Sequence, residues 1–150
     1  MTKRAYKERF YPTPAQAVVM AQSFGCTRFV WNNTLAYRTE AYQQRGEPVS
    51  HAAAEKRLVA LKANYPWLKD VSSVILQQTL RDQKAAFDNF FNPKLKARYP
   101  RFKRKDGRQS IRLTKAAFSY RDGEITIAKT TAPLPIRWSR PLPSEPSSIT

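Results

Sequence analysis

The sequence is poor in the residue types from which catalytic and metal sites are most often built. Its 150 residues include one cysteine, Cys26, and one histidine, His51, which excludes an internal disulfide and a cysteine-based zinc site. A catalytic Cys–His pair would have to use these two residues, and nothing in their spacing favours it. We expect Cys26, between Gly25 and Phe29, to be a small buried hydrophobic residue.

Glycines, clustered carboxylates and long apolar runs are also scarce. Four glycines argue against a glycine-rich phosphate loop. The eleven carboxylates are scattered, and Asp106, Asp122 and Glu124 lie in or beside expected turns, so no paired-acid magnesium site is apparent. No apolar run approaches the roughly 20 residues of a membrane-spanning helix, and the N-terminus lacks a secretory apolar core. The chain is therefore expected to be non-catalytic, cytoplasmic and without a cofactor or metal.

What the chain has in excess is positive charge. Its formal net charge is +16 and its pI is about 10.4, which suits DNA, RNA or an anionic membrane surface. Nearly half of this excess lies in residues 94–108, the basic segment, which holds eight Lys/Arg and one Asp. Pro93 and Pro100 prevent the continuous basic helix that a membrane surface would favour. Polyphosphate is the better partner, because each neutralised phosphate releases condensed counterions.

Two aromatic residues, Tyr99 and Phe102, lie within the basic segment, and two interpretations of them are open. Bases of a single strand often stack on aromatic rings along a positive groove. Alternatively, both rings pack onto a β core while the cations point outward, and this is the interpretation that we favour. For the cations we favour nucleic-acid contact over a merely solvated face, since arginine can grip phosphate with two hydrogen bonds.

The pattern of apolar and turn residues predicts one strand, four helices and then several strands. Residues 4–11 alternate, with Tyr6 and Phe10 on one face. Thr13-Pro14-Ala15-Gln16 is a capping box, from which a helix is expected to continue to Phe24 and end at Gly25. Three further helices are expected, over residues 27–45, 51–63 (capped by Ser50) and from Ser72 or Ser73 to Phe91.

Two helices joined at Gly25 would have the outline of a helix-turn-helix. The pattern alone is weak, since any helical hairpin looks similar. Trp31, Leu35 and Tyr37 are also bulky and apolar for a helix that faces a DNA groove. A stand-alone DNA-binding regulator that uses residues 14–45 is nevertheless kept as an alternative function.

After the basic segment the pattern changes to short strands. Strands are expected over residues 110–114, 117–120, 124–127 and 135–138, with Arg121-Asp122-Gly123 as a hairpin turn. The first strand has no partner nearby in sequence, so we expect it to pair with the late strands. The fold class is therefore predicted as α+β, with a four-helix bundle inserted into a small barrel-like β unit.

Several strings, in this order, resemble the transposon-encoded TnpB (OrfB) proteins. They are Ala5-Tyr6-Lys7-Glu8-Arg9-Phe10-Tyr11-Pro12-Thr13-Pro14, Phe24-Gly25-Cys26-Thr27-Arg28-Phe29-Val30-Trp31-Asn32, Leu76-Gln77-Gln78 with Leu80-Arg81-Asp82, Ala86-Phe87-Asp88-Asn89-Phe90-Phe91, Tyr99-Pro100-Arg101-Phe102-Lys103 and Ile136-Arg137-Trp138-Ser139-Arg140-Pro141-Leu142-Pro143. That family comprises RNA-guided DNA endonucleases that use a transposon-derived guide RNA.

The resemblance implies a split wedge β-barrel, residues 1–12 and 93–150, which a helical recognition domain, residues 13–92, interrupts. An incomplete barrel, without its closing strand, is part of this expectation and would leave an exposed edge. The implied partners are a guide RNA scaffold and target DNA. The family's RuvC-like nuclease half, with three acidic ligands and usually a zinc ribbon, has no counterpart in these residues. We therefore expect a truncated N-terminal module that does not cut DNA.

The candidate site residues form two sets. Nucleic-acid binding is assigned to Arg4, Lys7, Arg28, Lys94, Lys96, Arg98, Arg101, Phe102, Lys103, Arg104, Lys105, Arg108 and Arg112. The resemblance alone implies reading of the short motif beside the target by His51, Glu55, Ser73, Gln77 and Thr114. Helix capping for Ser73 and a solvated helix face for Gln77 are equally good interpretations. A structural RNA-binding protein of the ribosomal type would suit the charge but would not explain the strings.

Overall fold

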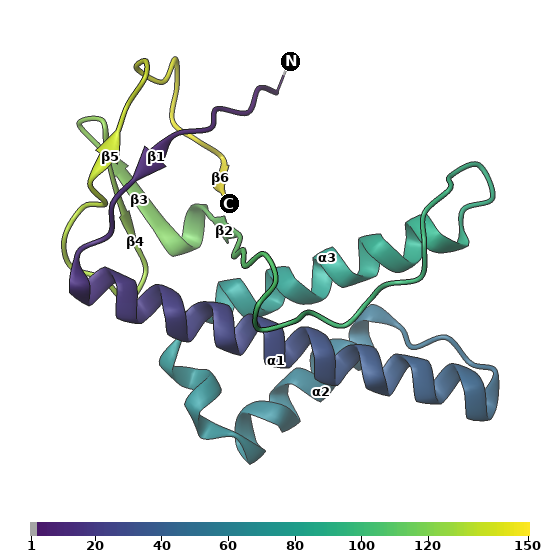
Figure 1. Cartoon of the computed structure of the whole chain (residues 1–150). Coiled ribbons are helices and arrows are strands. Elements are labelled where there is room, and N and C mark those ends of the chain that lie inside the picture. Colours follow the sequence, from purple (N-terminus) through teal and green to yellow (C-terminus); the bar gives the residue numbers. More distant parts are fainter. Residues whose placement is uncertain (1–2) are drawn as a thin grey trace.

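The computed structural model describes residues 3–150 and consists of a helical unit and a β unit (Figure 1). The helices are α1 (Pro14–Arg45), α2 (His51–Asn64) and α3 (Ser73–Phe91), with the 3₁₀ helix η1 (Pro66–Asp70) between α2 and α3. The β unit contains β1 (Arg9–Phe10), β2 (Leu113–Thr114), the 3₁₀ helix η2 (Lys115–Ala117), β3 (Phe118–Arg121), β4 (Glu124–Ile127), β5 (Ile136–Arg137) and β6 (Ser148–Ile149). This agrees with the predicted α+β class. The first two residues of the predicted 1–12 strand segment lie outside the described residues.

The first helix corrects the prediction, because residues 14–45 form one continuous helix rather than two. It begins at the predicted capping box, in which Gln16 N donates to Thr13 Oγ1 at 3.2 Å and Thr13 N donates to Gln16 Oε1 at 2.9 Å. Gly25 does not end the helix, because the buried residues Cys26 and Val30 continue its apolar face into the core, and such packing overrides the weak helix propensity of one glycine. The left-handed cap is Gly46, with φ 64°.

The helical unit is a three-helix arrangement, so the predicted four-helix bundle is wrong. Ser50 caps α2 as expected, since its Oγ accepts a hydrogen bond from Ala53 N at 3.1 Å. The core between the helices includes Val30 of α1, Leu58 of α2 and Leu76 and Leu80 of α3. These leucines therefore mark the inner faces of α2 and α3. The error is therefore confined to the number of helices before Gly46.

The β unit consists of three separate two-stranded antiparallel sheets, and within residues 3–150 they do not close into a barrel. The pairing of β1 with β5, with Phe10 opposite Ile136, confirms that the first strand pairs with a late one. Between β3 and β4, positive φ angles at Asp122 (51°) and Gly123 (77°) form the predicted tight hairpin turn. The pairing of β6 with β2 was not predicted.

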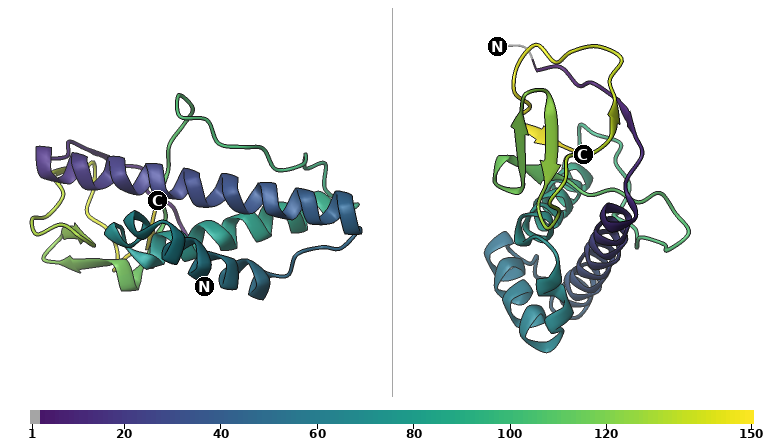
Figure 2. Two further views of the ribbon diagram at one scale, coloured as in Figure 1. Left: turned by 90° about the horizontal axis from the view of Figure 1, so that it is seen from below. Right: turned by 90° about the vertical axis from the view of Figure 1, so that its left-hand side faces the viewer.

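One end of the helical unit is embedded in the β unit. Ile75 of α3 and Phe24 of α1 belong to the same apolar cluster as Leu113, Phe118 and Ile127 of the β unit. The helices extend from this junction, as the two views in Figure 2 show. At 1.5 Å per residue, α1 is about 48 Å long. It therefore provides a single rigid support from the β unit to the free end of the bundle.

Candidate nucleic-acid interface

The basic segment leaves the end of α3 and returns along α1 to β2 without forming a helix or a strand (Figure 1). Three side chains of α1 fix its path. Thr39 Oγ1 lies 2.7 Å from the hydroxyl oxygen of Tyr99, Trp31 Nε1 donates to the carbonyl oxygen of Arg101 at 2.8 Å, and Asn32 bonds Lys103. These contacts follow one side of α1, because Thr39 lies about two helical turns after Trp31 and Asn32.

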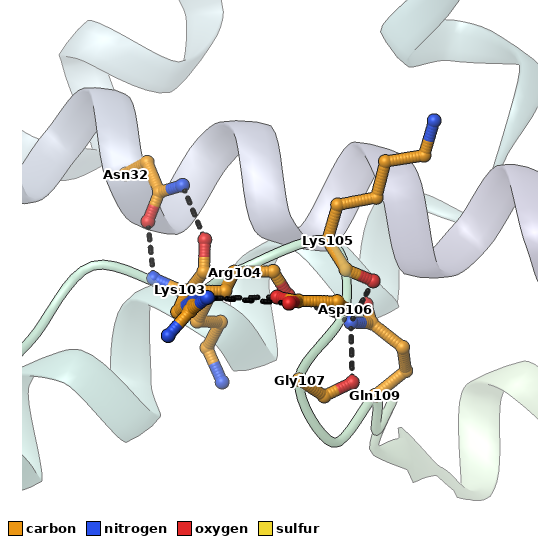
Figure 3. A network of polar contacts seen from close by, with 7 residues as sticks. All are labelled: Asn32, Lys103, Arg104, Lys105, Asp106, Gly107 and Gln109. Atoms are coloured by element: carbon orange, nitrogen blue, oxygen red, sulfur yellow. Dashed lines mark hydrogen bonds and ion pairs between the residues drawn. The ribbon is translucent and has the colours of Figure 1, made fainter.

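Asn32 holds the basic segment through its backbone (Figure 3). Its Nδ2 donates to the carbonyl oxygen of Lys103 at 2.9 Å, and its Oδ1 accepts from the amide of the same residue at 2.7 Å. The amide side chain thereby pairs with the extended chain as another strand would. Because both contacts use the backbone of Lys103, they leave its side chain to point elsewhere.

The turn after Lys103 is closed by polar contacts of its own (Figure 3). Gln109 Nε2 donates to the carbonyl oxygens of Arg104 and Gly107, both at 3.0 Å. Gly107 N donates to the carbonyl oxygen of Arg104 at 3.1 Å, and Arg28 Nη1 donates to Gln109 Oε1 at 3.3 Å. The turn over residues 104–109 is therefore attached to α1 by a second contact, one helical turn away from Asn32.

The two aromatic residues of the basic segment behave differently from each other. The Tyr99 ring packs edge-on against Phe87 and Phe90 of α3, with centroid separations of 5.4 and 5.2 Å. Tyr99 is thus an anchor, but on the helices and not on the β core as predicted. The Phe102 side chain is 57% exposed, so the prediction that it anchors the segment is wrong. Its ring remains available to a ligand.

The cations of the basic segment face solvent and are poorly neutralised. Seven of the eight are exposed, and Lys103 is half-buried with its Nζ 4.6 Å from the centroid of the Trp31 ring. Among the described residues, the one ion pair of this segment joins Arg104 to Asp106 at 3.2 Å. Both side chains of that pair are largely exposed, so it neutralises little. The result is a fixed, extended line of positive charge.

The remaining residues predicted to bind nucleic acid are divided between the two units. Arg28 and Arg112 lie beside the basic segment. Arg28 bonds Gln109, while Arg112 forms a 3.2 Å ion pair with Asp82 of α3. Arg4 and Lys7 are exposed and precede β1 in the β unit. The structure therefore brings Arg28 to the turn at the end of the basic segment through Gln109. It pairs Arg112 with α3 and places Arg4 and Lys7 on a different element.

The residues predicted to read a target motif are also divided. His51 Nε2 lies 3.1 Å from Glu55 Oε1 at the start of α2, and His51 lines a cavity with Phe87 near the end of α3. Ser73 and Gln77 are exposed at the beginning of α3, and Gln77 is about 15 Å along the helix axis from Phe87. Thr114 is half-buried in β2, which packs against α3. The five residues do not form one group.

The sequence analysis missed Arg38, which lies on the buried face of α1 with 8% of its surface exposed. Its Nη1 donates to the carbonyl oxygen of Val49 at 2.9 Å, and its guanidinium lies 5.2 Å from the centroid of the Phe87 ring. Burial lowers the pKa of Arg38, while the nearby charge of Asp88 opposes that shift. The sequence did hold one indication that Arg38 is buried. Arg38 follows Leu35 by three positions, and residues with this spacing lie on the same face of a helix.

The described residues contain neither a group of three or more metal-ligating side chains nor a helix long and apolar enough to cross a membrane. Cys26 is buried, as predicted, and it is a free thiol. Burial raises its pKa, and the negative charge of Asp70 adds to the shift. Cys26 is therefore a core residue.

Comparison with known proteins identifies one matching family model and several relatives. A family model described as the helix-turn-helix domain of OrfB proteins of the IS605 type matches residues 1–47, which here comprise β1 and the continuous helix α1. A proposed RNA-guided DNA endonuclease of Streptomyces pristinaespiralis is 46% identical over 153 residues, covering 99% of this chain and 38% of that protein.

Two further relatives match shorter stretches. The virulence protein VsdF of Salmonella dublin is 41% identical over 114 residues, which cover 70% of this chain and 96% of VsdF. The proposed RNA-guided DNA endonuclease InsQ of Escherichia coli K12 is 32% identical over 111 residues, which cover 73% of this chain and 27% of InsQ. The chain thus spans less than two fifths of the length of either relative named as an endonuclease.

Proposed function

The chain belongs to the TnpB (OrfB) family of transposon-encoded proteins, and on that premise we propose that its 150 residues form a nucleic-acid-binding module for a guide RNA scaffold and its target DNA. The observation that carries this proposal is the line of exposed cations in the basic segment, fixed on α1 by Trp31 and Asn32. Because the segment is held before binding, ordering it costs little when the ligand arrives.

In this proposal, phosphate contacts position the module and base pairing between guide and target supplies most of the sequence specificity. The phosphate contacts are made by Arg28, Arg112 and the basic segment, with Arg4 and Lys7 as a separate contact on the β unit. Motif reading is proposed for two places, Ser73, Gln77 and Thr114 at the junction with the β unit, and His51 with Glu55 at the start of α2. The module acts in the cytoplasm, where guide RNA and DNA are both present.

We propose that these residues bind without cutting. The eleven carboxylates of the chain are dispersed, whereas metal-dependent cleavage of a phosphodiester needs acidic ligands held together around the metal. Cleavage by the relatives named as endonucleases would then depend on parts of their chains that this one does not match. The purified 150-residue protein should leave DNA intact in magnesium, with or without guide RNA. Cleavage by it would overturn this part of the proposal.

The alternative of a stand-alone DNA-binding regulator receives less support. Its reading surface would be the second half of α1, and Trp31, Asn32 and Thr39 on that helix already hold the basic segment. A base edge could reach these side chains only after the segment had detached. Strong preference for one DNA duplex sequence in the absence of RNA would favour the regulator instead.

The binding experiment compares two fourfold variants with the wild type. The basic-segment variant carries Arg101→Gln, Arg104→Gln, Lys105→Gln and Arg108→Gln. The matched control variant carries Lys56→Gln, Lys115→Gln, Arg121→Gln and Lys129→Gln, which are exposed residues outside the segment. Both lose four positive charges and keep the contacts of Asn32 with Lys103, so net charge alone cannot separate them.

The measurement is the affinity of each protein for a structured RNA and for duplex DNA of equal length. At about 1 kcal/mol for each ion contact in water, loss of four contacts weakens binding about 100- to 1,000-fold. We expect that loss for the basic-segment variant and less than tenfold for the control variant. Equal losses in both variants, or no binding by the wild type, would overturn the proposal.

A further inference from the structure

A surface depression of about 610 Å³ lies between α1 and η1, beside the basic segment. Its lining consists of Gly25, Arg28, Phe29, Asn32 and Asn33 from α1 and Trp67 from η1. The five α1 residues share one side of the helix, because they recur at intervals of three and four positions. Its volume falls in the range of small-ligand sites. Of its lining residues, only Arg28 is among the proposed phosphate contacts.

The aromatic wall of the depression is held in place from within the protein. The Phe29 ring packs edge-on against Tyr65 and Trp67, with centroid separations of 4.9 Å to each. Tyr65 and Trp67 are nevertheless 39% and 43% exposed. A positioned tryptophan with part of its ring uncovered presents an apolar, polarisable face to solvent. Such a face suits a planar partner that stacks on it.

Gly25 has no role within the protein that explains the choice of glycine. It lies inside α1 with a helical backbone, where alanine would be the better helix former. Apart from its chain neighbours and the backbone of its own helix, a Cβ at this position would meet no atom within 4 Å, so packing against other side chains does not exclude a side chain here. Gly25 lines the depression. Its missing side chain therefore allows a bound molecule to approach the helix backbone closely.

The polar side of the depression connects it to the basic segment. Arg28 and Asn32 line the depression and also hold Gln109 and Lys103, respectively. The exposed cations Arg104 and Lys105 follow Lys103 directly. Asn33 Oδ1 accepts a hydrogen bond from Arg57 at 2.8 Å, an arrangement that directs the Asn33 amide nitrogen away from Arg57. An occupant would thus meet an aromatic face, an amide donor and positive charge.

We propose that this depression is a nucleotide pocket, which takes one unpaired nucleobase of a bound single strand onto Trp67 and over Gly25. The phosphate beside that base would lie towards Arg28 and the basic segment. Charge complementarity favours this occupant over an apolar protein segment, because an anionic strand that follows the cations passes the mouth of the depression. The pocket rests on the proposed function for its partner, and it adds a site that distinguishes unpaired from paired strands.

The test uses two variants of the pocket and one control in the full chain. Trp67→Ala removes the stacking face, and Gly25→Ala adds a methyl group where the base would lie. The control is Tyr11→Ala, since Tyr11 is also exposed (59%) and lies before α1, outside the pocket. Each protein is titrated with a single-stranded oligouridine, the matching oligodeoxythymidine and a duplex of the same length.

Stacking of one base on an aromatic ring corresponds to about 5- to 150-fold in affinity. We expect Trp67→Ala and Gly25→Ala to weaken single-strand binding by that factor while duplex binding changes less than twofold, with Tyr11→Ala unchanged on every ligand. The larger loss, on oligouridine or on oligodeoxythymidine, identifies the strand as RNA or DNA. Gly25→Ala should also raise the melting temperature, because alanine favours the helix.

Several outcomes would overturn the pocket and leave the proposed function intact. They are wild-type single-strand affinity in both pocket variants, equal losses on single strand and duplex, or a lower melting temperature for Gly25→Ala, which would give the glycine a structural role. Gly25→Ala keeps the pocket testable if Trp67→Ala fails to fold. If the proposed function itself is wrong, the wild type binds none of the three ligands, and that result is distinct from all of these.

Discussion

At the scale of single residues, Asn32 determines where the basic segment lies. Both hydrogen-bonding groups of its side chain are used on the backbone of Lys103, at 2.9 and 2.7 Å. Because the backbone is the part recognised, the lysine side chain is left to the Trp31 ring, and its exposed neighbours are left to a ligand. One amide on α1 therefore fixes the position of several cations without neutralising any of them.

Replacing Asn32 by alanine should loosen this attachment. Two hydrogen bonds at roughly 0.5–1.5 kcal/mol each are lost, so the amide of Lys103 should exchange with solvent about 5- to 150-fold faster. Hydrogen exchange followed by NMR or mass spectrometry measures this rate. Asn33→Ala is the control, because Asn33 bonds Arg57 and not the segment. Unchanged exchange at Lys103 in Asn32→Ala would contradict the attachment.

The buried thiol of Cys26 gives a second prediction at this scale. Burial, with a smaller contribution from Asp70, raises its pKa in the folded protein, so a thiol-specific disulfide reagent at pH 8 should react slowly until urea unfolds the chain.

In alkaline solution the unfolded chain loses the thiol proton before the folded protein does. The associated stability is full below about pH 8.5 and is lost as the pH rises through the folded pKa. Urea unfolding at pH 7 and pH 10 should show this loss in the wild type but not in Cys26→Ala. Rapid labelling of the folded protein would contradict the burial.

At the scale of elements, α1 shows where local sequence rules were sufficient and where they were not. Thr13 and Gln16 form the predicted capping box, because a cap depends on residues adjacent in sequence. Gly25 did not end the helix, because its continuation depends on the contacts of Cys26 and Val30 with α2 and α3. Those partners lie far away in the chain, and a local rule does not include them.

Substitution of Gly25 by alanine distinguishes a continuous α1 from two helices joined by a turn. In a helix interior, proline costs about 3 kcal/mol and alanine stabilises by roughly 1 kcal/mol relative to glycine. We therefore expect Gly25→Pro to lower the free energy of unfolding in urea strongly and Gly25→Ala to raise it slightly. If residue 25 instead ended a helix in the left-handed conformation, alanine would lower the free energy of unfolding, because a residue with a Cβ is strained at positive φ.

In the β unit, too, some strand pairings were predictable from the sequence and one was not. The β3–β4 hairpin was predictable because Asp122 and Gly123 favour its positive φ angles locally. The partner of β1 was predictable by elimination, since no strand lies near it in sequence. The pairing of β6 with β2 joins two strands of two residues each. So short a strand has no periodicity to recognise, and it depends on neighbouring structure for its existence.

At the scale of the whole molecule, the positions of the charges were predictable from the sequence, but the contacts that hold the charged segment in place were not. The sequence alone located the cations of the basic segment, because the position of each Lys and Arg can be read directly from it. The contacts that hold them join Trp31 to Arg101 and Arg28 to Gln109, which are separated by most of the helical unit. Tyr99 was correctly expected to be an anchor, but its partners Phe87 and Phe90 are helical. The path of the chain determines these contact partners, and the pattern of residues in the sequence does not predict that path.

The central claim is that the basic segment, rather than net charge in general, contacts phosphate. Its most direct test is the slope of log affinity for RNA against log salt concentration, measured for the wild type, the basic-segment variant and the control variant. With a slope of about 0.7 for each phosphate contact on a single strand, four lost contacts should flatten the dependence by about 3. We predict that change for the basic-segment variant and a change below 1 for the control variant. A basic-segment variant that keeps the wild-type slope would contradict the account.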